Sequence, residues 1–403
     1  MADIRGRGGF GGTWYARVVT VACICVLCII LIAGLWPLHI PANKVSWLKN
    51  QNGLVFGRYG SVVSAGPFRG RDSAGDAACS LEIWLEPTRI DQKKTILSFD
   101  GSSHPGDPFS LQQDKDALRV QRHNVDGQGT ARTAWFMVDG VFRDKKPVFV
   151  TVTLGAQDTS VYVNGVLAKV SPLLGVSRNN LTGRLVVADS PTASNNWSGQ
   201  ILRLAIYRQQ LTTAQVAQHW ENWSNGLRPA VVENEGPVAL YLFDEGKGSI
   251  VHNQLDPATD LIIPSHYSVL HSGFLLTPWR EYKPTWSYWQ DFIVNITGFI
   301  PLGLFVAAYF STVRVIDRAR TATILLGFAV SLTIELLQAY LPTRSSGMTD
   351  LFTNTMGTAI GVLLYSCSFT QELLSKAMHD PTDLVQDPSQ GKLKNNARLV
   401  TSV

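Results

Sequence analysis

The stretch PVFVTVTLGAQDTSVYVNGVLAKV, residues 147–170, alternates apolar and polar side chains with a period of two. Such alternation is typical of β-strands that bury one face. The dipeptide Asn164-Gly165 interrupts the second half of the stretch, and it favours the positive φ angles of a tight hairpin turn. The stretch therefore predicts antiparallel strands that include a hairpin closed at residues 164–165.

Similar runs lie on both sides of this stretch, separated by Gly, Pro, Asn and Asp. They are CSLEIWLEP (79–87), KTILSFDG (94–101), GRLVVADS (183–190) and GQILRLAIYRQQL (199–211). Short strands at this spacing predict an antiparallel β-sandwich. The last run is followed by TTAQVAQHWENW, which predicts a short amphipathic helix capped by Thr212 or Thr213.

Four apolar runs approach the roughly 20 residues that a membrane-spanning helix needs. They are 18–36, 292–310, 322–341 and 351–367. The first run is longer than the core of a usual signal peptide and no small-residue cleavage site follows it, so we expect an uncleaved anchor. The fold class predicted is a multi-domain protein, with an α-helical membrane bundle of four spans and an extracytoplasmic antiparallel β-sandwich.

The predicted organisation has six parts in chain order. They are a basic, glycine-rich cytoplasmic tail (1–17), transmembrane helix 1 (18–36), the β-sandwich (45–230), a linker with an aromatic membrane-surface segment (231–290), transmembrane helices 2–4 (291–368) and a polar cytoplasmic tail (369–403). The cations that flank the helices fall on one side if all four helices span: Arg5, Arg7, Arg17, Arg314, Arg318, Arg320, Lys392, Lys394 and Arg398. Both termini are then expected in the cytoplasm, with the sandwich outside.

Composition excludes several functional classes. The net charge of +4 is scattered, and no basic stripe alternates with aromatic residues, so we expect no nucleic-acid partner. Four of the five cysteines lie in apolar segments, and the eight histidines are dispersed, so we expect no metal site and no cofactor. A calcium ion bound by Asp100, Asp107 or Asp189 of the sandwich is the alternative.

Polar residues interrupt the helical segments at particular positions. Glu335 and Gln338 lie near the end of the third apolar run, on one helix face. An ionisable group within an apolar span is costly, and it marks a functional hypothesis. Arg344 follows closely and is a candidate counter-charge for Glu335 or Asp350, or a ligand for a phosphate or carboxylate.

DFIVNITGFIPLG (291–303) and DLFTNTMGTAIG (350–361) share the pattern D-x-x-x-N-x-x-G and form a weak internal repeat. The shared positions are Asp291, Asn295 and Gly298 in the first copy, and Asp350, Asn354 and Gly357 in the second. Each acid is a candidate helix N-cap and each asparagine a candidate interhelical donor. We expect close helix packing at Gly298, Pro301, Gly303, Gly357 and Gly361. The polar residues of both copies, with Glu335, Gln338 and Arg344, form the predicted membrane site.

Two family resemblances rest on these motifs. VTVTL, VYVNGVLA, GRLVVADS and WSGQILRLAIYRQQLTTAQVAQHW resemble the laminin-G-like, concanavalin A-like lectin/glucanase domains, which implies a jelly-roll sandwich. We expect the sandwich to bind a glycan or to stabilise the complex at the cell surface. Glucanases of this type carry a strand motif E-I-D-x-E. Here EIWLE (82–86) places Trp84 at the middle acid, so we interpret Glu82 and Glu86 as parts of an ordinary strand. Trp197 is a candidate for stacking on sugar rings or for the domain core.

The membrane segments resemble the VanZ-like family. Its pattern E-x-x-Q-x-x-x-x-x-R, followed by D-x-x-x-N-x-x-G-x-x-x-G, matches Glu335, Gln338, Arg344, Asp350, Asn354, Gly357 and Gly361. The family is named after a protein linked to resistance to the glycopeptide teicoplanin. The resemblance implies a multi-pass protein of the bacterial inner (plasma) membrane, with a role in the cell envelope.

The expected function is non-enzymatic, and we assign no catalytic residue. The expected partners are membrane lipid and a cell-wall glycan or glycopeptide, with a resistance-type role implied by the family resemblance. One alternative is an intramembrane transporter or enzyme that uses Glu335 as a proton acceptor. The other is a structural anchor for a carbohydrate-binding module.

Overall fold

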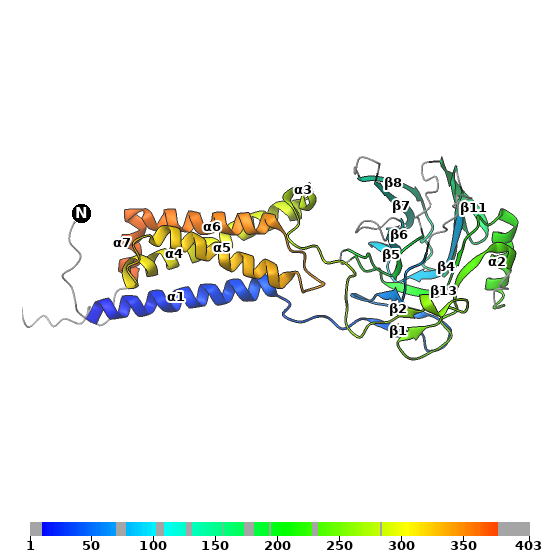
Figure 1. Ribbon diagram of the computed structural model, residues 1–403, viewed down its shortest axis with the longest axis horizontal. Coiled ribbons are helices and arrows are strands. Elements are labelled where there is room, and N and C mark those ends of the chain that lie inside the picture. Colours follow the sequence, from blue (N-terminus) through cyan, green and yellow to red (C-terminus); the bar gives the residue numbers. More distant parts are fainter. Residues whose placement is uncertain are drawn as a thin grey trace, which may run out of the picture. The chain divides into compact units, whose positions relative to one another are not determined.

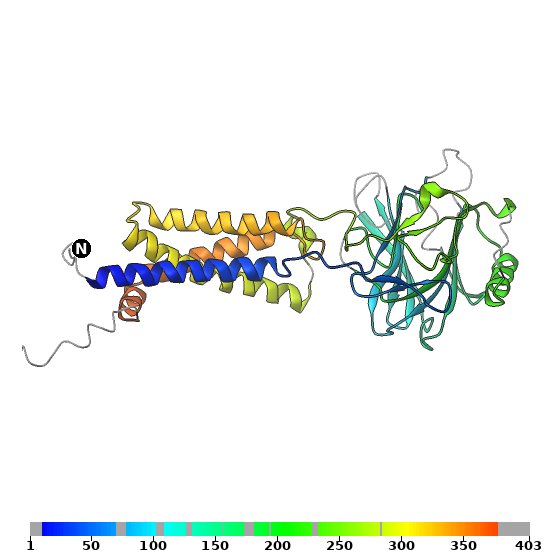
Figure 2. The same cartoon turned by 90° about the horizontal axis from the view of Figure 1, so that it is seen from below.

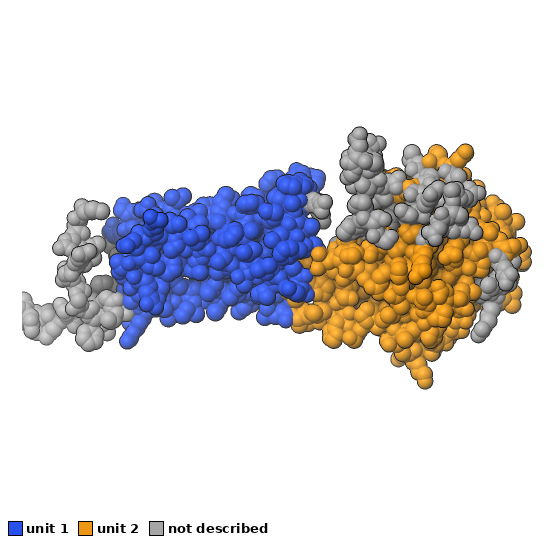
Figure 3. All heavy atoms as spheres, viewed as in Figure 1, with its two compact units in different colours: residues 1–38, 273–340, 346–403 blue, residues 39–272, 341–345 orange. Residues whose placement is uncertain are grey.

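The computed structural model describes residues 10–69, 78–101, 109–125, 131–155, 157–172, 181–192, 195–227, 233–282 and 284–377. The chain divides into two compact units, coloured separately in Figure 3. The helical unit comprises residues 1–38, 273–340 and 346–403, and the sandwich unit comprises residues 39–272 and 341–345. Each unit is described by itself.

The sandwich unit contains two antiparallel sheets of eight strands each within the described residues, which confirms the predicted antiparallel sandwich. The first sheet runs in the order β1 (Val45–Trp47), β2 (Leu54–Phe56), β13 (Gly199–Tyr207), β4 (Cys79–Pro87), β9 (Val148–Leu154), β10 (Thr159–Val163) and β11 (Val166–Ser171), with β14 (Pro237–Tyr241) also paired to β13. The second runs β15 (Ile250–Val251), β16 (Leu261–Ile262), β3 (Val62–Ser64), β12 (Arg184–Val187), β5 (Lys93–Asp100), β6 (Phe109–Asp114), β7 (Ala117–Val125) and β8 (Ala131–Val138).

The period-two pattern places apolar side chains between the sheets. Leu81, Ile83 and Leu85 of β4 are fully buried in one cluster with Leu97 and Phe99 of β5. Each fully buried leucine or phenylalanine contributes about 1.5–3 kcal/mol relative to an exposed one. This inter-sheet core is what holds the sandwich together.

The predicted hairpin forms between β10 and β11. Asn164 and Gly165 adopt φ angles of 50° and 78°, as a tight turn of this kind requires. The Asn164 side chain also accepts a hydrogen bond from the Phe149 backbone N–H at 3.0 Å, which ties the turn to β9.

The helix after β13 is α2 (Thr213–Ser224), and its N-cap is Thr212 with a capping box to Gln215. Val216 and Trp223 of α2 join a second apolar cluster with Phe149 and Tyr207. These residues lie on the opposite face of the first sheet from the inter-sheet core. The helix therefore covers the outer face of β4, β9 and β13 and closes that face to solvent.

The helical unit is built around α1 (Phe10–Leu35), α4 (Trp286–Ala308), α5 (Ala319–Gln338) and α6 (Met348–Ser366), which run side by side in Figures 1 and 2. A short helix α3 (Pro278–Glu281) precedes α4, a π-helical turn (Tyr309–Val313) follows it, and α7 (Ser368–Ala377) follows α6. Ile30, Phe299, Leu302, Val306 and Ile334 form the apolar core of this unit.

Three helices of the described chain are long and apolar enough to span a membrane: Trp14–Leu35, Trp286–Val313 and Ala319–Gln338. The prediction of four such helices is corrected on this point, because α6 does not qualify by composition. Asp350, Asn354 and a series of threonines lower its hydropathy. Much of this polar content faces the other helices, where Thr353, Asn354 and Thr358 are buried.

Candidate functional site

Glu335 lies at the end of α5 and is 1% exposed. Its Oε2 accepts a hydrogen bond from the backbone N–H of Gly347 at 2.8 Å, and the Ser346 side chain also hydrogen-bonds the carboxyl group. Gly347 is the N-cap residue of α6. The N-terminal N–H groups of a helix lack intrahelical partners and carry partial positive charge, so a carboxylate stabilises that end. Glu335 thus connects α5 to the start of α6.

A second carboxylate occupies the same helix terminus. Glu281 of α3 accepts hydrogen bonds from the backbone N–H of Thr349 at 2.9 Å and from the Thr349 hydroxyl. The sequence analysis missed Glu281. No spacing rule could have found it, because 68 residues separate it from Thr349. The protein's own carboxylates therefore occupy the anion-binding position at the start of α6.

Gln338 has a different role. It is 7% exposed, and its Nε2 donates a hydrogen bond to the backbone carbonyl of Gly34 at 2.7 Å. Gly34 lies in the last turn of α1, where carbonyl groups have no intrahelical partner. Gln338 thus caps α1 from α5, on the same helix as Glu335.

The two motif copies are joined to each other. The Asn295 amide of the first copy donates to Asp350 Oδ1 of the second at 2.8 Å, which links α4 to α6. Asp291 lies five residues inside α4, which begins at Trp286, and its side chain is exposed. Thr285, not Asp291, is the N-cap residue of α4.

Asn354 connects α6 to α5. Its Nδ2 donates to Ser331 Oγ at 2.9 Å, and the residue is 4% exposed. Its Oδ1 is buried and has no hydrogen-bond partner among the described residues. Because a buried amide oxygen without a partner is costly, this atom marks a place where a further donor would be stabilising.

Three of the five predicted packing residues are glycines that admit a neighbouring helix. A Cβ at Gly303 would meet the backbone of Thr358, and Cβ atoms at Gly357 and Gly361 would meet the carbonyls of Ile296 and Ile300. Close packing of α4 against α6 therefore depends on these glycines. Gly298 faces open space, and Pro301 lies inside α4.

Arg344 lies in the segment 341–345, which belongs to the sandwich unit. Its backbone N–H donates to the carbonyl of Leu341 at 3.0 Å, so the segment forms a turn.

The cluster within the helical unit consists of Glu335, Gln338, Asn295, Asp350 and Asn354. Its members connect α1, α4, α5 and α6, and the structure adds Glu281 to them.

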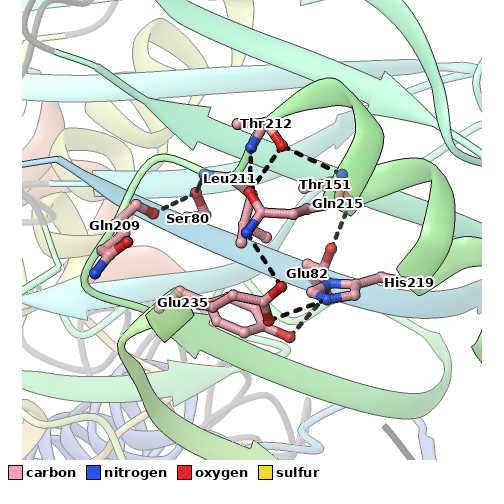
Figure 4. A network of polar contacts seen from close by, with 10 residues as sticks. Ser80, Glu82, Thr151, Gln209, Leu211, Thr212, Gln215, His219 and Glu235 are labelled. Carbon is pink, nitrogen blue, oxygen red and sulfur yellow. Dashed lines mark hydrogen bonds and ion pairs between the residues drawn. The ribbon is translucent and has the colours of Figure 1, made fainter. Parts of the chain in front are cut away.

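The sandwich contains a separate buried network, shown in Figure 4. Glu82 is 0% exposed and accepts hydrogen bonds from the Thr151 hydroxyl at 3.2 Å and the Tyr207 hydroxyl at 3.0 Å. His219 of α2 lies between two carboxylates, with Nδ1 3.0 Å from Glu82 and Nε2 3.2 Å from Glu235. The network fastens α2 to β4, β9 and β13.

The electrostatics of this network favour a charged imidazole. Burial by itself lowers the pKa of His219, but the carboxylates of Glu82 and Glu235 outweigh it and the pKa is raised above 6.5. Burial and the same carboxylates raise the pKa of Tyr207 well above its ordinary value, which keeps the phenol protonated. Glu82 is therefore a structural ion-pair partner rather than a carboxylate open to a sugar substrate.

Trp197 and Asp189 are also buried. The Trp197 indole N–H donates to Gln113 Oε1 at 2.7 Å, so Trp197 belongs to the core and does not form a sugar platform. Asp189 accepts from the Asn195 N–H at 2.7 Å and the Tyr267 hydroxyl at 2.7 Å. Burial raises the pKa of Asp189 to about 6 despite these hydrogen bonds.

For the calcium alternative, both carboxylate oxygens of Asp100 lie 2.9 Å from His271 Nε2. Asp107 lies outside the described residues. Among the residues that the structure describes, no group of three His, Cys, Asp or Glu side chains is arranged to hold a metal ion.

Two family models match the chain. The VanZ/LLP1 model matches residues 247–370, and the model of the concanavalin A-like lectin/glucanases superfamily matches residues 60–217. The combination of domains expected from the sequence is therefore present. No curated protein matched the chain significantly.

Solved structures similar to this chain include the binding domain of botulinum neurotoxin serotype D, at 13% identity and a TM-score of 0.34, covering 46% of each chain. The binding domain of Paraclostridial Mosquitocidal Protein 1 aligns at 12% identity and a TM-score of 0.34, over 46% of this chain and 47% of that one. The chain thus spans about half the length of the structures that it matches.

Proposed function

We propose that this chain, which combines a VanZ/LLP1 segment with a concanavalin A-like domain, is a membrane-anchored glycan-binding protein of the bacterial cell envelope. The observation that carries the proposal is the joining of a lectin-like sandwich to apolar helices on one chain. Apolar helices of this length would hold the protein in lipid, and the sandwich would present its surface to polymers outside the membrane.

The proposed orientation places the sandwich outside the cytoplasm and both termini inside it. The positive-inside rule supports this, since Arg17 of α1 directly precedes the apolar run that begins at Val18. At the same end of the bundle, Arg314 and Arg318 lie between α4 and α5, and Arg320 lies in the first turn of α5. This position of the C-terminus requires α6 to cross as well, although α6 is not among the three described helices that are apolar enough by composition. Its exposed large side chains are apolar, including Phe352, Met356 and Leu363, and these would face lipid.

Aromatic side chains near the start of α4 support a membrane boundary there. Trp279 and Trp286 are 77% and 78% exposed, and Tyr288 makes edge-to-face contacts with Tyr282 and Trp289. Tryptophan and tyrosine rings of this kind settle at the lipid headgroup level. We place the segment 278–289 in the outer headgroup layer.

Binding rather than hydrolysis is proposed for the sandwich because Glu82, in the one stretch similar to a glucanase motif, is enclosed by its own network. A glycosidase needs two carboxyl groups that flank the scissile bond. Glu82 is fully buried beneath α2 and paired to His219. A bound sugar would have to displace the helix to reach it.

The first test combines topology and glycan retention. Reporter fusions at both termini and within the sandwich are expected to give cytoplasmic signals at the termini and an exported signal in the sandwich. Detergent-solubilised protein is expected to be retained on purified cell-wall sacculi, and a variant lacking residues 45–230 is expected to pass through. Equal retention of the two proteins would overturn the glycan-binding proposal.

A second candidate function is an intramembrane site. It is favoured by Asn354 Oδ1, which has no hydrogen-bond partner among the described residues, and by Glu335 in the same bundle. The resistance-type role implied by the VanZ resemblance supplies its assay. Teicoplanin susceptibility is compared in a sensitive host for wild type, Glu335→Gln and the sandwich deletion, at matched membrane levels. Protection that is lost only in Glu335→Gln would assign the activity to the helices, and protection lost only in the deletion would assign it to the sandwich.

A further inference from the structure

In the second sheet, β6, β7 and β8 are neighbouring strands (Figure 1). The inward residues of these strands, Leu111, Val120 and Phe136, belong to the inter-sheet core. The register pairs Gln112 with Arg119, and Gln121 with Trp135. Side chains alternate along a strand, so these four residues share the face turned away from the core.

The face presents an aromatic ring that the fold leaves accessible. Trp135 is 47% exposed, whereas Trp197 and Trp223 of the same unit are fully buried. The Arg119 guanidinium carbon lies over the Trp135 ring, 4.4 Å from its centroid. This stacking fixes the indole plane and the cation together, which reduces the ordering cost of binding a ligand.

Polar groups suited to a hydroxylated ligand surround the ring. The Gln112 Nε2 donates to Ser110 Oγ at 3.2 Å, which places that amide on the same face. The Arg119 Nε is buried and has no hydrogen-bond partner within the described chain. Asp114, on the same strand face as Gln112, is neutralised by Lys93 at 3.1 Å. The net charge of the patch is therefore positive.

We propose that the patch formed by Gln112, Arg119 and Trp135 binds an acidic oligosaccharide. The Trp135 ring would stack on the apolar face of a sugar, as aromatic rings do with flat apolar surfaces. Arg119 would pair with the sugar carboxylate, because its planar fork matches carboxylate geometry. The Gln112 amide would bond a ring hydroxyl. The inference rests on the proposed glycan-binding function and names the ligand class and the residues.

The test uses the full chain in detergent and two probes, tetragalacturonate and its methyl ester. The ester keeps the sugar rings and removes the charge. Wild type is expected to bind tetragalacturonate about tenfold more tightly than the ester. Arg119→Gln is expected to remove that preference, whereas Trp135→Ala weakens both probes about tenfold and Trp135→Tyr retains most of the binding.

Matched controls are Arg143→Gln, an exposed arginine paired with Asp116 outside the patch, and Trp279→Ala, an exposed tryptophan of the helical unit. Both are expected to bind like wild type. If the affinity for each probe is unchanged in both Trp135→Ala and Arg119→Gln, the patch is not the binding site and the proposal is overturned. If neither probe binds, the assignment of an acidic ligand is overturned. Retention of the protein on sacculi is measured separately, and that result decides whether the proposed glycan-binding function stands.

Discussion

Asn295 and Asp350 lie 55 residues apart, and the amide of one donates a 2.8 Å hydrogen bond to the carboxylate of the other. Asn295 is the asparagine of the first copy of the repeated motif, and Asp350 is the aspartate of the second copy. The two copies therefore interlock. The glycines of the second copy bring the helices close enough for this bond, because Gly357 and Gly361 lie against the α4 backbone.

The Asn295–Asp350 bond is expected to couple α4 and α6 energetically. In a double-mutant cycle of Asn295→Ala and Asp350→Ala, we expect a coupling energy of about 0.6 kcal/mol and at most about 1.7, the range for hydrogen bonds between membrane helices. Unfolding of the purified protein in detergent supplies the four free energies. Strictly additive effects would mean that the bond contributes nothing to stability.

Gly357→Ala is expected to destabilise the helical unit by about 1–3 kcal/mol, because the new methyl group would meet the Ile296 carbonyl. Gly298→Ala is the matched control on the first motif copy. Nothing lies within 4 Å of a Cβ there, so helix propensity alone predicts a gain of up to about 1 kcal/mol. Melting temperatures that change in the same direction for both variants would contradict this account of the packing.

His219 is expected to make the stability of the sandwich depend on pH. Its folded pKa is raised, so its contribution is fully present below the unfolded pKa of about 6.5 and is lost as pH rises through the folded value. The free energy of unfolding should therefore fall as pH increases above about 6.5. His219→Gln should flatten this decline, and His266→Gln, at an exposed histidine, should retain it. Chemical denaturation across a pH series measures the effect.

Asp189 is expected to add a second dependence at lower pH. Its pKa rises from 3.8 to about 6 on folding because burial disfavours the charge. The folded state therefore holds the proton more tightly, and stability should decline as pH rises from about 4 to about 6. Asp189→Asn removes the titrating group and should flatten the curve in that window. Asp91→Asn, at an exposed surface carboxylate, serves as the control.

The β-sandwich could be predicted from the sequence alone, because its signals are local. Each strand carries its own period-two alternation, and the Asn164-Gly165 pair marks a hairpin turn. It also indicated which helical residues were unusual, since a carboxylate such as Glu335 stands out in an apolar run. Composition alone did not establish whether α6 crosses a membrane. A helix whose polar residues face its neighbours has a low mean hydropathy, and only the packed structure shows which way those residues point.

The tertiary structure alone decided the partners of these residues. Glu335 and Glu281 meet at the start of α6, and Gln338 reaches the end of α1, because helix packing joins segments that no sequence spacing relates. The same holds for Glu82, which the strand pattern places on one face without revealing that His219 of α2 covers it. Local periodicity fixes the face of a side chain, but long-range packing determines what meets it there.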